Sequence, residues 1–94
     1  MELRFFTEVV SESGDCLHGE TWAENADGEV GVLKWHSDGM TTFIDSVETN
    51  GRTTLLGVRL LRELRSYKRE PIVPGLMNRA GERLWRLFLA RYRY

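Results

Sequence analysis

The stretch TFIDSVETNGRTTLLGVRLLRELRSY, residues 42–67, switches from strand-like to helix-like sequence near Asn50-Gly51. Before the switch, apolar and polar side chains alternate, as they do in a half-buried strand. After it, leucines recur at helical spacing and arginines occupy the other faces. The stretch therefore predicts a strand over residues 40–48, followed by an amphipathic and basic helix that ends near Tyr67.

Three further strands are predicted upstream of this stretch. Residues 3–10 are rich in aromatic and β-branched side chains, and residues 11–15 supply a turn that contains glycine. Residues 16–24 and 29–36 flank Asn25-Ala26-Asp27-Gly28, in which Asp-Gly provides the positive φ angles that a tight reversal needs. We therefore expect four antiparallel strands in a meander.

Two elements are predicted downstream of the helix. Pro71 and Pro74 bracket Ile72-Val73, a short apolar piece that proline restricts to a sheet edge or a strand end. A second amphipathic helix follows, with Asn78 as its cap. No repeat or linker interrupts the chain. We expect one α+β domain over residues 1–94, with the element order β-β-β-β-α-β-α.

Composition and charge narrow the function classes. The single cysteine, Cys16, excludes an internal disulfide. Because the sequence lacks both a signal-peptide pattern and an apolar run near the ~20 residues of a membrane span, we expect a cytoplasmic protein that does not enter membranes. Residues 1–50 carry two basic and eleven acidic side chains, whereas residues 51–94 carry eleven basic and three acidic ones.

This charge asymmetry has two interpretations. Acidic sheet faces and basic helix faces neutralise each other, within the fold or between copies, or the basic half forms a site for a phosphorylated ligand. The net charge of −1 and the lack of a recognised nucleic-acid motif argue against nucleic acid as the partner.

The join between residues 44 and 61 carries a loop motif. The strand Ile44-Asp45-Ser46-Val47 is followed by Arg52-Thr53-Thr54-Leu55-Leu56-Gly57, which leads into Val58-Arg59-Leu60-Leu61. Together with the order of elements, this join resembles the GCN5-related N-acetyltransferase (GNAT) superfamily in a shortened form. In that family, a loop of pattern Gln/Arg-x-x-Gly-x-Gly/Ala opens a helix, and its N–H groups hold the pyrophosphate of acetyl-CoA. Leu55 stands here at the first glycine of the pattern.

The resemblance implies acetyl-CoA as cosubstrate and direct attack of an amine on the thioester. Backbone N–H groups near Val47 are then expected to orient the acyl carbonyl, and Asn78 is expected to contact CoA. Glu48, with Asp45 beside it at the end of the strand, is the candidate base that takes the proton of the amine. Trp85 stands where the family has the tyrosine that acts as general acid. The residues expected to hold the pyrophosphate are Arg52, Thr53, Thr54, Leu55, Leu56 and Gly57.

Two function classes stay open. One is a minimal acetyl-CoA-dependent N-acetyltransferase. The other is a non-catalytic interaction or structural protein of the same fold, for example a phage-encoded, virion-associated one. The family's first strand is followed by two helices that are missing here, so we expect a protein partner or self-association to cover the surface they leave. No metal is expected, since Cys16, His18 and His36 lack the paired spacing of zinc ligands.

Overall fold

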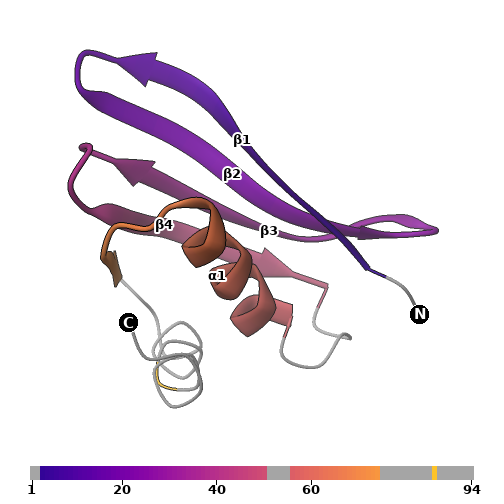
Figure 1. Cartoon of the computed structure of the whole chain (residues 1–94). Coiled ribbons are helices and arrows are strands. Elements are labelled where there is room, and N and C mark those ends of the chain that lie inside the picture. Colours follow the sequence, from indigo (N-terminus) through magenta and orange to yellow (C-terminus); the bar gives the residue numbers. More distant parts are fainter. Residues whose placement is uncertain (1–2, 51–55, 75–85, 87–94) are drawn as a thin grey trace.

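The computed structural model describes residues 3–50, residues 56–74 and Arg86, and Figure 1 shows the arrangement of the elements. The predicted α+β class is confirmed, because a five-stranded sheet is combined with a helix. Arg86 belongs to the second predicted helix and lies among the described residues, where it is helical and has an exposed side chain. The elements are β1 Arg4–Ser13, β2 Cys16–Asn25, β3 Gly28–Ser37, β4 Thr42–Thr49, α1 Leu56–Tyr67 and β5 Ile72–Pro74.

The five strands form one mixed sheet in the order β1-β2-β3-β4-β5. The first four strands are antiparallel neighbours, as the sequence predicts. β5 lies at the edge, where its prolines are tolerated, and it pairs parallel to β4. Parallel neighbours require a long crossover connection, and the segment that contains α1 supplies it.

The predicted hairpin of β2 and β3 is confirmed and closes on Asn25 and Gly28, which are paired. The Asn25 side-chain oxygen accepts the backbone N–H of Asp27 at 2.8 Å. Gly28 has a φ of +119°, a conformation that residues with a Cβ rarely adopt. The first turn is shorter than predicted, because β1 continues to Ser13 and the reversal needs only two residues before Cys16.

α1 covers one face of the sheet and lies beside β3 and β4 in Figure 1. Its leucine stripe is buried, as the helical spacing predicts, but Tyr67 at the end of that stripe is 50% exposed. The opposite face of the sheet carries the alternate residues of each strand. Within the described residues, no helix has the length and apolar character needed to cross a membrane. The buried apolar core consists of Ala23, Val30, Leu33, Trp35, Ile44, Leu56, Val58, Leu60, Leu61, Leu64 and Ile72.

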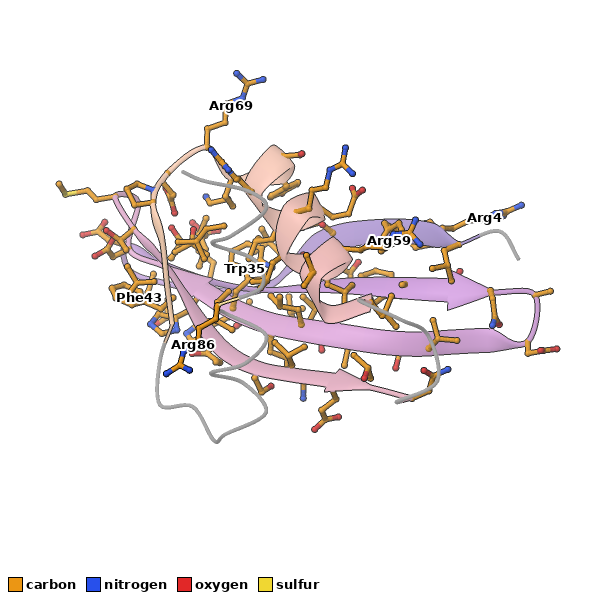
Figure 2. All side chains as sticks on the ribbon, turned by 90° about the horizontal axis from the view of Figure 1, so that it is seen from below. Arg4, Trp35, Phe43, Arg59, Arg69 and Arg86 are labelled. Carbon is orange, nitrogen blue, oxygen red and sulfur yellow. The ribbon has the colours of Figure 1, made fainter. Side chains whose placement is uncertain are left out.

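Trp35 is the largest buried side chain and lies under α1, where Figure 2 labels it. Its indole fits against β2 because Gly19 has no side chain. A Cβ built on Gly19 would lie 2.1 Å from the indole Cζ2 atom, well inside van der Waals contact. The glycine on β2 is therefore a packing requirement of the core.

Candidate functional site

The residues predicted to bind acyl-CoA are only partly among those that the structure describes. Val47 is half-buried and packs against the core from β4. Leu56 and Gly57 are buried in the first turn of α1. A Cβ on Gly31 would lie 2.9 Å from a Leu56 methyl carbon, so this leucine points into the sheet. Five predicted residues lie outside the described part of the chain: Arg52, Thr53, Thr54, Leu55 and Asn78.

Glu48, the base candidate from the sequence, is exposed on β4 and is paired with Val32 of β3. Asp45 is also exposed, but the structure does not join it to Glu48. Its carboxylate instead contacts His36 of β3, with 2.7 Å between Asp45 Oδ1 and His36 Nδ1. We call this pair the His36–Asp45 dyad. The strand end therefore carries two separate candidate bases.

The dyad lies on the sheet face opposite α1. The His36 ring is stacked on Phe43, with 4.9 Å between ring centroids and 16° between planes. On the other side the ring of His18, which is paired with His36 across β2 and β3, lies at 5.7 Å. Phe43 lies at the end of the sheet where β3 and β4 meet (Figure 2). The sequence suggests the two histidines only as weak candidates for metal binding or for a base beside Cys16, and nothing local joins His36 to Asp45.

β4 contains a β-bulge beside the dyad. Trp35 is paired with Ile44, whereas Lys34 is paired with Ser46, so Asp45 is the extra residue between them. Asp45 and Phe43 lie two residues apart on one face of β4, so the contact of Asp45 with His36, the partner of Phe43, is a diagonal cross-strand contact. The register of β3 against β4 decides this contact, and local sequence does not reveal the register.

The join between α1 and β5 is fixed by Glu70. Its Oε1 atom accepts hydrogen bonds from the hydroxyls of Ser37 and Thr42, the second at 2.6 Å. Lys68 Nζ lies 3.8 Å from the same oxygen. Thr42 also donates its backbone N–H to the carbonyl of Pro71 at 2.8 Å. These contacts hold the start of β5 against the start of β4.

The environment of Glu70 keeps its carboxyl ionised. Burial by itself raises the pKa of Glu70, but the hydroxyls of Ser37 and Thr42 and the positive charge of Lys68 outweigh it. The pKa of Glu70 is therefore lowered from its ordinary value. Since Ser37 and Thr42 are fully buried, the two hydroxyls depend on this carboxylate as their acceptor.

Cys16 and His18 approach each other on β2, with 3.6 Å between Sγ and Nε2. Among the residues described, no group of three or more histidine, cysteine or carboxylate side chains is placed to hold a metal ion. The contact places the Cys16 thiol next to His18, the histidine that neighbours the dyad.

The outer side of α1 carries the basic charge that the sequence analysis noted. Arg62, Arg65, Ser66 and Arg69 line a shallow depression of about 380 Å³. Arg69 projects away from the body of the molecule (Figure 2). The helix thus presents a stripe of guanidinium groups on its side remote from the sheet.

Comparison with known proteins adds no relative. The sequence matches no model of a known protein family, and no curated protein matches it. The resemblance to the GNAT superfamily therefore rests on the loop motif and on the order of the elements.

Proposed function

We propose that this domain binds an acyl-CoA thioester as GNAT proteins do and transfers the acyl group to an amine. The observation that supports the proposal is the geometry of β4 and β5. These parallel neighbours, joined through α1, pair only at Thr42 to Ile44. Residues 45–48 of β4 continue beyond the last pair, and no described strand borders them on that side. Backbone groups of a strand that lacks a neighbour are open to a ligand.

The start of α1 supports an anion site next to this strand. Helix N-termini attract phosphate, because their first N–H groups have no partner in the helix and the helix dipole is positive there. The first turn of α1 contains no acidic side chain that would repel a pyrophosphate. The Leu56 side chain is buried, so it lies on the core side of that turn. Arg52, just upstream in the sequence, is the expected side-chain donor.

Calorimetric titration with acetyl-CoA and with CoA tests the proposal. Wild-type protein is expected to bind both saturably, and Arg52→Ala should weaken binding by about 10- to 150-fold, the effect of losing a charged hydrogen-bond partner. Arg4→Ala is the matched control, since it removes the same charge from β1 at the other edge of the sheet. No binding at millimolar ligand, or equal weakening by both substitutions, contradicts the proposal.

The second candidate function is that of a non-catalytic interaction protein. The observation that favours it is the exposed apolar surface at β1, the edge strand opposite β5. Val9 and Val10 are 41% and 56% exposed, and Phe6, stacked on Trp22 at 5.4 Å, is 39% exposed. An apolar edge strand is a template for pairing with another chain. Sedimentation velocity tests this candidate. A monomer at all concentrations argues against self-association, whereas a dimer that dissociates in the Val10→Lys variant supports self-association through β1.

A further inference from the structure

The hydrogen bond of the dyad fixes which nitrogen of His36 is open. An ionised carboxylate only accepts hydrogen bonds, so in the neutral form of the ring the proton lies on Nδ1 and the Nε2 atom keeps its lone pair. The stacking of the ring on Phe43 and its proximity to His18 restrict its rotation. His36 is thus an oriented base that points an unprotonated nitrogen away from Asp45.

The dyad also lies at the point where β4 and β5 separate. The last pair between these strands is Ile44 with Pro74, and Asp45 is the next residue of β4. Val47, the residue expected to orient the acyl carbonyl, is two positions further on, which is ~7 Å along a strand. The Asp45 side chain contacts His36 of the neighbouring strand β3 at this point.

From this placement we infer that His36 is the general base that takes the proton of the acceptor amine, and that Asp45 is its positioning residue. The inference rests on the proposed acyl-CoA function and names the base of the same site. It replaces Glu48, which is exposed and paired with Val32 further along β4. A primary amine is the acceptor class that the step requires, because it arrives as an ammonium ion and must lose a proton before it attacks.

The proposed acyl transfer conserves atoms and electrons at each step. His36 Nε2 takes one proton from the ammonium group, and the nitrogen lone pair so freed forms a C–N bond with the thioester carbonyl carbon. When the tetrahedral species collapses, the C–S bond breaks and its electron pair leaves with the CoA sulfur. The sulfur takes the second proton that the new amide nitrogen sheds, and His36 returns its own proton to solvent.

Several titratable and charged groups surround the dyad. His18 faces it from β2, with Cys16 beyond it. Glu20 of β2 and Lys34 of β3 form the next cross-strand pair on the same face of the sheet. Asp38 directly follows β3 in the chain, and its carboxylate interacts electrostatically with His36. α1 contributes no charge here, because it lies on the other face of the sheet.

The test measures thiol release from acetyl-CoA with spermidine and with a lysine-containing peptide as acceptors. His36→Gln is expected to lower kcat/KM by ~10²- to 10⁴-fold, the usual contribution of a general base, and to remove the ascending limb of the pH profile. The dissociation constant of acetyl-CoA should stay unchanged. Asp45→Asn should lower kcat/KM at least ~10-fold, since it perturbs the tautomer. Added imidazole should partly restore the rate of His36→Ala, which a merely structural role would not allow.

Each failure has a separate meaning. If acetyl-CoA does not bind, the proposed function fails and the inference falls with it. If acetyl-CoA binds but neither amine promotes thiol release, the transfer part of the proposed function fails and the inference falls with it. If transfer occurs and Glu48→Gln abolishes it while His36→Gln does not, the proposed function stands and the assignment of His36 is overturned. Melting curves of every variant identify those that lose activity through unfolding.

Discussion

Replacement of Glu70 by alanine should destabilise the domain far more than removal of an ordinary surface carboxylate. The substitution leaves the hydroxyls of Ser37 and Thr42 buried without the acceptor they use. A hydrogen bond to a charged group contributes about 1.5–3 kcal/mol, and an unpaired buried group costs a similar amount. Two such bonds to one partly exposed carboxylate give an expected loss of roughly 2–4 kcal/mol, because water can enter the space that the Glu70 side chain leaves and replace part of the lost bonding.

Urea denaturation and thermal melting followed by circular dichroism measure this loss. For a domain of this size, the expected loss corresponds to a melting point lower by roughly 10–30 °C. Glu29→Ala is the matched control, since Glu29 is exposed in the β2–β3 hairpin and carries the same charge. Its effect should stay within about 0.5 kcal/mol. If the two variants lose equal stability, the reasoning about Glu70 is refuted.

A triple variant separates the hydrogen bonds from the charge. Replacing Ser37 by alanine and Thr42 by valine in the Glu70→Ala background removes the stranded hydroxyls. This variant should recover part of the stability, since removal of both partners of a buried hydrogen bond costs less than removal of one. No recovery would mean that Glu70 acts through the neighbouring Lys68 instead.

Three further predictions concern the pH dependence and the glycines. The Asp38 carboxylate accepts the N–H groups of Met40 and Thr41, which lowers its pKa. The stability that this carboxylate contributes should therefore be complete above the ordinary aspartate pKa and disappear as pH falls through the lowered pKa. Carboxyl titration by NMR measures the pKa, and an ordinary titration midpoint would contradict the prediction. Gly19→Ala places a Cβ against the Trp35 indole, so the free energy of unfolding from urea denaturation should fall by about 1–3 kcal/mol and the tryptophan fluorescence should change. An unchanged spectrum and urea midpoint would show that the Trp35 ring has room to move. A Cβ at Gly28 has no atom within 4 Å, but alanine there would have to adopt a positive φ, so Gly28→Ala should lower the free energy of unfolding by more than ~1 kcal/mol in the same assay. An increase in stability would show that the turn relaxes.

Much of the fold could be predicted from local sequence. The Asp27-Gly28 reversal and the leucine spacing of α1 act over a few residues, so they are visible without tertiary contacts. The partner of β5 could not be read, because its attachment depends on Glu70, which contacts residues 33 and 28 positions earlier in the chain. In the local sequence, nothing distinguishes Glu70 from other carboxylates, since it only follows a predicted helix and precedes a proline.

The candidate site was harder to predict than the fold. Glu48 was chosen because it ends a predicted strand, and the structure leaves it exposed opposite Val32. The dyad joins His36 to Asp45 across two strands, nine positions apart, and local sequence does not reveal the register that brings them together. Residue type and position along a strand identify candidate bases, but only the register identifies the partner of each.

The sequence alone determined the order of strands and helix, the hairpin reversal and the stripe that becomes the core. Only the tertiary structure decided which side chains meet on the open face. An unbroken ladder from the Asn25 and Gly28 pair would set His18 opposite Trp35, but a register shift beyond Glu24 sets it opposite His36. Because side chains alternate along a strand, this single step keeps Trp35 under α1 and gathers the histidines on the other face.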